Sequence, residues 1–127
     1  MFKELIISIV IIISIFSLDM FTQNYTEKSV ERITEQFSNL KKYISDDNAE
    51  NIQNTIKNID DDWEKIHDKL AYYIEHDELE KVDTAIITMK SYIETKDYSS
   101  AIAELDEGKF VLEHIQEKNS FNLQNIF

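Results

Sequence analysis

The chain begins with an unbroken apolar run and then changes to single apolar residues at regular spacing. The stretch from Leu5 to Leu18 reads LIISIVIIISIFSL and contains no charged residue. Extended to Phe21, this run would form a helix about 26 Å long, which is within the range of membrane-spanning helices. We therefore expect residues 1–24 to be a transmembrane signal anchor and residues 25–127 to form a separate acidic domain.

A cleaved signal peptide is the alternative reading of the apolar run. Signal peptides start with net positive charge and end at small residues, whereas here Lys3 is offset by Glu4 and no A-x-A-like pair follows the run. We therefore expect an uncleaved, single-pass anchor in the cell membrane. No positive charge follows the run until Lys28. The positive-inside rule then favours an extracytoplasmic position for the domain.

After the anchor, apolar residues recur in steps of three and four in four successive segments. This spacing places one apolar stripe along each of four helices, and the stripes must be buried against one another. The stripes comprise Val30, Ile33, Phe37, Leu40 and Ile44; Ala49, Ile52, Ile56, Ile59, Trp63, Ile66, Leu70 and Tyr73; Leu79, Val82, Ile86, Met89 and Ile93; and Tyr98, Ala101, Leu105, Gly108, Leu112 and Ile115. The expected fold is all-α, an N-terminal transmembrane helix followed by an antiparallel bundle of about four helices.

The helix boundaries follow from capping residues, because the chain holds one Gly and no Pro. We expect helices near residues 25–45, 47–74, 77–95 and 98–117. Aspartate and serine are favoured as N-caps, with Glu three residues later in a capping box. The expected caps are Asp47 with Glu50, Asp77 with Glu80, and Asp97 or Ser99.

The C-terminal tail from Ser120 to Phe127 contains four apolar residues after the last expected helix. A polar terminus usually frays, but this tail is apolar enough to dock on the bundle. It is alternatively a short linear motif for a partner. Asn125, Ile126 and Phe127 are therefore candidate interaction or structural residues.

The charge of the chain restricts its partners. Lys and Arg total 13 and Asp and Glu total 25, which gives a net charge of −12. Phosphate backbones and anionic lipid headgroups repel a surface of this sign, so we expect no nucleic-acid partner. A basic protein surface is the natural electrostatic partner.

No pattern of catalytic residues stands out. The chain has no Cys, and its single Gly108 rules out a P-loop or a GxSxG elbow. We therefore expect no enzymatic activity and no cofactor. Gly108 falls on an apolar stripe, where it lets another helix approach closely. Trp63, Tyr72 and Tyr73 are expected to be core or half-buried aromatic residues.

The metal-binding residue types are explained more simply by structure. His67, His76 and His114 form no HExxH pattern, so we interpret them as helix-surface and turn residues and expect no metal site. The run Asp60-Asp61-Asp62 lies inside a periodic helix and lacks the Gly of a calcium loop. We interpret it as a solvated face.

The sequence resembles a family of short, single-pass, membrane-anchored helical proteins of unknown function from spore-forming Firmicutes. The resemblance implies the architecture and the membrane attachment, and it implies no activity. Because His76, Asp77 and His114 fall in matching segments, they become candidate interaction or structural residues. Besides the N-terminal span, the matching residues are Trp63 with Leu70, Ile74-Glu75-His76-Asp77-Glu78-Leu79, Lys90-Ser91-Tyr92-Ile93, Ala103-Glu104-Leu105, Leu112-Glu113-His114-Ile115 and Asn125-Ile126-Phe127.

These observations favour a membrane-tethered helical interaction module whose partner is another membrane protein. The alternative is a helix-bundle sensor domain that binds a cation or a small ligand. The first hypothesis uses the anchor and the acidic surface, whereas the second requires a binding site inside the bundle. No pattern in the chain indicates an oligomeric state.

Overall fold

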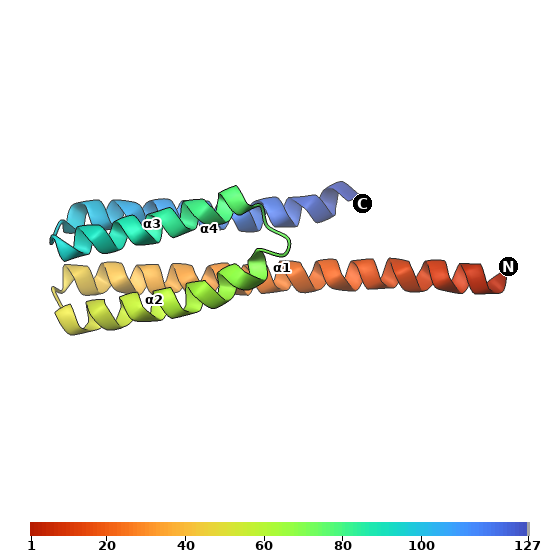
Figure 1. Ribbon diagram of the computed structural model, residues 1–127, viewed down its shortest axis with the longest axis horizontal. Coiled ribbons are helices and arrows are strands. Elements are labelled where there is room, and N and C mark those ends of the chain that lie inside the picture. Colours follow the sequence, from red (N-terminus) through yellow and green to blue (C-terminus); the bar gives the residue numbers. More distant parts are fainter. Residues whose placement is uncertain (127) are drawn as a thin grey trace.

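The computed structural model describes residues 1–126, with side chains for residues 1–120. Four helices make up this part of the chain: α1 (Phe2–Ser45), α2 (Ala49–Leu70), α3 (His76–Glu94) and α4 (Tyr98–Ile126). Successive helices run in opposite directions and form one bundle (Figure 1). The predicted all-α fold, with an N-terminal apolar helix and a bundle of four helices, is therefore confirmed.

The first helix is longer than the sequence pattern predicted. Residues 2–45 form one continuous helix of 44 residues, so the helix expected to start near residue 25 is the second half of α1. No Gly or Pro interrupts this region, and nothing else there stops the helical hydrogen bonding. The N-terminal part of the apolar half extends beyond the other three helices, past the end of α4 (Figure 1). By length and composition, α1 is able to cross a membrane.

The predicted apolar stripes form the core of the bundle. Ile33, Ile59, Leu79, Leu105 and Ile115 represent all four helices, and each is at most 2% exposed. Ala49 is an exception because it lies in the first turn of α2 and is exposed. The spacing of three and four thus placed the buried faces correctly along most of each helix.

Three pairs of helices pack with their backbones close together, whereas α2 and α3 do not. Close backbone approaches join α1 with α2, α1 with α4, and α3 with α4. Side chains link α2 to α3: the Lys90 ammonium lies 3.0 Å from a carboxylate oxygen of Asp60, and the Trp63 indole N–H donates to Asp83 over 2.6 Å. Polar pairs therefore connect α2 to α3 at the edge of the apolar core.

Two of the three predicted caps are wrong, and the reason is visible in the turn before α2. The amides of Asp47 and Asn48 donate to Ile44 and Tyr43 carbonyls, which is the Schellman arrangement at a helix C-terminus. This arrangement holds Asp47 at a φ of 51°. Asn48 consequently becomes the N-cap and accepts from the Asn51 amide over 3.2 Å.

The other helix ends also differ from the predicted boundaries. Helix α3 begins at His76, with Glu75 as its N-cap and no side-chain capping bond, so Asp77 lies inside the first turn. Asp97 accepts from the Ser100 amide, which confirms the cap predicted for α4. Helix α2 ends at Leu70 rather than near residue 74, and α4 continues to Ile126 rather than ending near residue 117.

Candidate functional site

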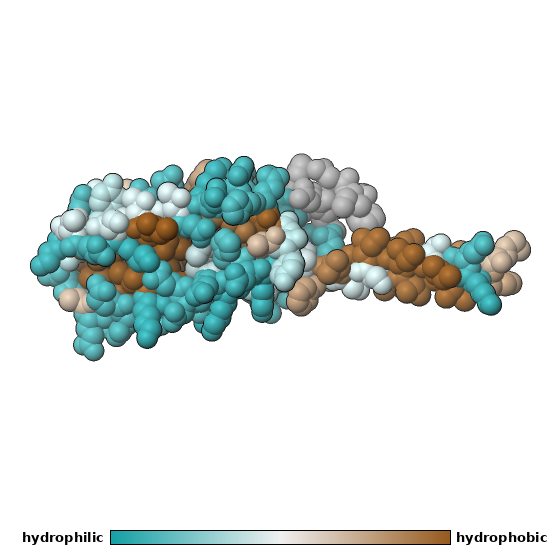
Figure 2. Space-filling model, viewed as in Figure 1, coloured by the Kyte–Doolittle hydropathy of each residue, from teal (hydrophilic) through white to brown (hydrophobic). Residues whose placement is uncertain are grey.

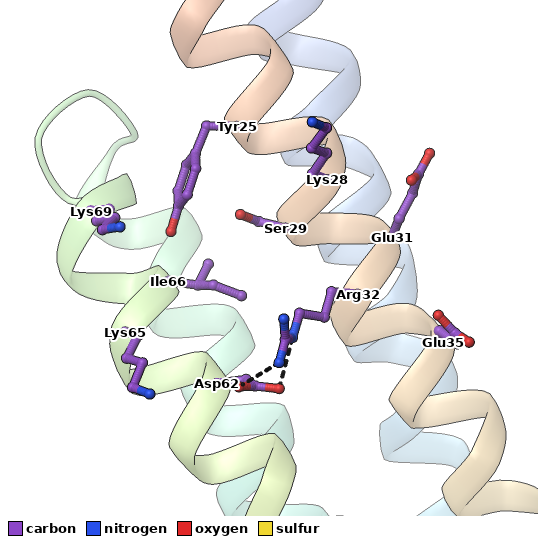
Figure 3. A pocket seen from close by; sticks show the side chains of 10 residues that line it. All are labelled: Tyr25, Lys28, Ser29, Glu31, Arg32, Glu35, Asp62, Lys65, Ile66 and Lys69. Atoms are coloured by element: carbon purple, nitrogen blue, oxygen red, sulfur yellow. Dashed lines mark hydrogen bonds and ion pairs between the residues drawn. The ribbon is translucent and has the colours of Figure 1, made fainter.

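A groove between α1 and α2 opens where the exposed apolar half of α1 meets the bundle. Its volume is about 610 Å³. Four of the residues that line it are Lys or Arg, which is unusual in a chain with a net charge of −12. The lining residues, drawn in Figure 3, are Tyr25, Lys28, Ser29, Glu31, Arg32, Glu35, Asp62, Lys65, Ile66 and Lys69.

The helical repeat and the pairing of the two helices bring these cations together. Lys28 and Arg32 are four residues apart on α1, and Lys65 and Lys69 are four residues apart on α2. Residues at this spacing share one face of a helix. Because α1 and α2 are antiparallel, both pairs face the same groove (Figure 3).

A charged pair joins α1 to α2 at one end of the groove. Arg32 donates to both carboxylate oxygens of Asp62, over 2.9 and 3.2 Å, and Gln36 donates to the same carboxylate over 2.6 Å. Burial, the largest single influence, raises the pKa of Asp62, but these hydrogen bonds and the nearby positive charges together lower that pKa below its usual value. Asp62 therefore stays ionised and neutralises Arg32.

The lysines of the groove are not neutralised in the same way. Within the described residues, neither Lys28 nor Lys65 forms an ion pair with a carboxylate. The Lys69 ammonium lies 5.3 Å from the centre of the Tyr25 ring, in a cation–π contact. Glu31 and Glu35 also line the groove, although their side chains project from α1 on the side away from α2 (Figure 3). With the four cations against Glu31, Glu35 and Asp62, the lining of the groove carries a net charge of +1 in a chain of −12.

Polar and apolar groups form the wall between the lysines. The side chains of Tyr25 and Ser29 point from α1 toward α2, and Ile66 points from α2 toward α1 (Figure 3). Ser29 is buried and Ile66 is 6% exposed. The groove thus offers hydroxyl groups and ammonium groups above an apolar floor, a combination suited to an anion that carries an apolar part.

A second polar cluster lies beside the groove, at the same end of the bundle. The hydroxyls of Thr26 and Tyr73 are 2.8 Å apart, and the Asn119 side-chain amide donates to Thr26 over 3.4 Å. Burial raises the pKa of Tyr73, and the neighbouring Tyr25 adds to this effect, while the Thr26 hydrogen bond partly opposes it. The cluster ties α1, α4 and the α2–α3 loop together.

The candidate residues predicted from the sequence lie elsewhere. His76 is exposed at the start of α3 and its Nε2 is 3.1 Å from the Glu80 carboxylate. Asp77 and His114 are exposed on α3 and α4. Among the residues that the structure describes, no group of three His, Asp or Glu could hold a metal ion. These three residues do not converge on the groove.

The predicted interaction residues at the C-terminus are only partly covered by the structure. Asn125 and Ile126 belong to the last turn of α4, but their side chains and the whole of Phe127 lie outside the described residues. Docking of the tail on the bundle therefore stays a prediction.

Two interpretations of side-chain position need correction. In the acidic run, Asp60 and Asp62 pair with Lys90 and Arg32, so only part of the run is a solvated face. Tyr72, expected in or near the core, is 90% exposed, because α2 has already ended at Leu70 and Tyr72 lies in the loop.

The sequence reasoning missed the cationic groove. Only part of the signal was present in the sequence: α1 and α2 each carry two cations at a spacing of four residues, and the pair on α1 follows the apolar run. The net charge directed attention away from these residues, and their meeting depends on a register that becomes visible only once Arg32 is seen to face Asp62.

Comparison with known proteins adds one finding. The model of a family described as a domain of unknown function, DUF4363, matches residues 20–126. The matched region starts where the apolar run ends and covers the whole bundle. No curated protein and no solved structure matches the chain.

Proposed function

This chain belongs to the DUF4363 family of domains of unknown function, and we propose that it is a membrane-tethered helical interaction module whose partner is another membrane protein. The observation that supports this proposal is the exposure of the apolar half of α1. Large side chains from Phe2 to Phe21 are exposed, for example Ile13 at 58% and Phe21 at 68%. An apolar surface of this size needs lipid or another apolar surface to cover it.

Figure 2 shows the contrast between the two parts of the molecule on one face. The exposed half of α1 is almost entirely hydrophobic, whereas the bundle is largely hydrophilic. In this proposal the anchor crosses the cell membrane once, and the bundle stands on the extracytoplasmic side. Tethering restricts the bundle to a thin layer next to the membrane, which raises its effective concentration for other proteins of the same membrane.

The surface of the bundle offers contacts that suit a protein partner. Ile87 on α3 is 60% exposed and Phe110 on α4 is 70% exposed. Large apolar side chains of this kind contribute much of the binding energy when a partner buries them. The acidic surface around them accelerates encounter with a basic partner and makes this encounter sensitive to salt.

Membrane attachment is tested first, with the full chain in native membranes. The protein is expected to stay in the membrane fraction after carbonate extraction, and its N-terminus is expected to be intact. Recovery in the soluble fraction, or a mature N-terminus near residue 20, would contradict the anchor.

Partner capture is tested next, with tagged full chain extracted from native membranes in mild detergent at low salt. A specific membrane protein should co-purify, its recovery should fall at high salt, and Phe110→Ser should reduce the recovery while Lys57→Ser leaves it unchanged. If no specific partner is captured and the purified chain instead binds a metal ion or a metabolite tightly, the sensor alternative replaces the interaction module.

A further inference from the structure

We propose that the cationic groove between α1 and α2 binds the phosphate-bearing headgroup of an anionic membrane lipid. This inference rests on the membrane attachment proposed above and is independent of the protein partner. It concerns Lys28, Lys65 and Lys69 together with the hydroxyls of Tyr25 and Ser29.

The height of the groove above the membrane supports a lipid ligand. The apolar run ends at Phe21, and along a helix Tyr25 and Lys28 follow at about 6 and 10 Å. The headgroup layer on each side of a bilayer is roughly 5–8 Å thick. Lys69 lies against the Tyr25 ring and is therefore at the same height. The near end of the groove thus lies in the headgroup layer, within reach of flexible lysine side chains.

The chemistry of the groove matches such a headgroup. Ammonium groups and hydroxyls are good donors to phosphate oxygens. Neither Lys28 nor Lys65 forms a direct ion pair with a carboxylate among the described residues, and the longer-range interaction of Lys65 is with Asp62, which already pairs with Arg32. Arg32 is already paired with Asp62, so the lysines carry the available positive charge. Ile66 provides an apolar floor for the glycerol and upper acyl carbons. Tyrosine, represented here by Tyr25, is enriched at the membrane interface.

The anchor, and not the charge of the whole protein, favours a lipid over a dissolved anion. The net charge of −12 repels soluble anions and anionic headgroups alike, whereas the anchor holds the groove against a surface where lipid headgroups are dense. Basic pockets beside membrane-spanning helices bind anionic headgroups for this reason. The groove lysines would accordingly offset, on one side of the bundle, the repulsion between the acidic protein and anionic headgroups.

The test uses purified full chain in uncharged detergent micelles, with thermal unfolding followed by circular dichroism. Four additives are compared: phosphatidylglycerol, phosphatidylcholine, inorganic phosphate and glycerol phosphate. A ligand that binds only the folded state raises the unfolding temperature, and at equal concentration the rise is larger for the tighter ligand. We expect phosphatidylglycerol to raise this temperature and the other three additives to have little effect.

A pair of variants separates the groove from general electrostatic attraction. Lys28→Gln with Lys65→Gln removes two groove cations that make no ion pair, so the fold should be unchanged. Lys42→Gln with Lys57→Gln makes the same change of charge on the same two helices, with Lys42 about 21 Å farther along α1 than Lys28. The groove variant should bind phosphatidylglycerol about tenfold or more weakly, while the control variant should match the wild type.

Three outcomes would overturn the proposal. These are an equal loss of binding in both variants, an equal shift with phosphatidylcholine, or an equal shift with inorganic phosphate or glycerol phosphate, which would indicate a site for a soluble anion. Carbonate extraction and partner capture do not depend on the groove lysines. Failure of lipid binding is therefore distinguishable from failure of the anchor or of the interaction module.

Discussion

Gly108 on α4 faces the ring of Phe37 on α1 so closely that a Cβ atom at position 108 would lie 2.9 Å from Phe37 Cε2. The same Cβ would lie 3.4 Å from the Cβ of Ala85 on α3. Phe37 is 2% exposed, so its ring has little room to retreat. The packing role expected for Gly108 is therefore visible in the contact of three helices.

We predict that Gly108→Ala destabilises the protein, although Ala favours a helix by about 1 kcal/mol over Gly. Overpacking a well-filled core costs about 1–3 kcal/mol, which over most of this range is more than the gain, and the buried Phe37 ring places Gly108 toward the costly end. Chemical denaturation of both proteins measures the difference. The double variant with Phe37→Leu should lose less than the sum of the single changes. A more stable Gly108→Ala protein would show that the ring moves aside freely.

The turn between α3 and α4 contains a residue in an unfavourable backbone conformation. Lys96 has a φ of 59°, a region that costs a residue with a Cβ about 1 kcal/mol relative to Gly. We predict that Lys96→Gly stabilises the protein by up to about 1 kcal/mol. Lys57→Gly, inside α2, should instead destabilise by about 1 kcal/mol. Equal losses in the two variants would mean that the turn gains nothing from Gly.

Alkaline conditions should lower the free energy of unfolding through Tyr73, which hydrogen-bonds Thr26 of α1 from the α2–α3 loop. Burial raises the pKa of this phenol above 10.0, so the folded state favours the protonated form. The corresponding stability is complete below pH 10 and is lost as the pH rises toward the pKa of the folded state. Tyr73→Phe should remove this dependence and cost about 1 kcal/mol at neutral pH. Tyr72→Phe, at a neighbouring exposed position, should keep the alkaline loss.

Acidic conditions should weaken the junction of α1 and α2 through Asp62. Its pKa is held below the ordinary value of 3.8. The stability from this shift is complete above that value and is lost as the pH falls through the pKa of the folded state. Asp62→Asn should flatten this part of the pH profile, whereas Asp61→Asn, at an exposed position, should not. Urea unfolding at a series of pH values from 2 to 6 compares the three proteins.

The buried faces of the helices could be predicted from the sequence because they depend on local spacing alone. Ile33, Ile59 and Leu79 repeat with the helical period, and each is completely buried. The ends of the helices were harder to predict than their buried faces. Asp47 and Asp97 look equivalent in the sequence, but the Schellman turn after α1 uses Asp47 as its left-handed residue, while Asp97 follows the left-handed Lys96 and is free to cap α4.

The groove could not be predicted because it depends on how two helices slide against each other. Lys28 and Lys65 are far apart in the sequence, and they line one groove because α1 packs against α2 in the register that also pairs Arg32 with Asp62. The continuity of α1 was missed for a different reason. A change in composition near residue 22 indicated a boundary, but the backbone has no residue there that breaks a helix.

In the membrane-anchored arrangement proposed above, the unbroken backbone of α1 makes the membrane segment and the bundle move as one rigid unit. About 37 Å of helix separates Phe21 from the far tip at Asp46. A change of about 20° in the tilt of the membrane segment, which equals the average tilt of such helices, moves this tip sideways by about 13 Å. Rotation of the segment about its own axis likewise turns the whole bundle. A change in bilayer thickness or a neighbouring membrane helix would thereby change the orientation of the bundle relative to the membrane, because α1 is continuous from Phe2 to Ser45.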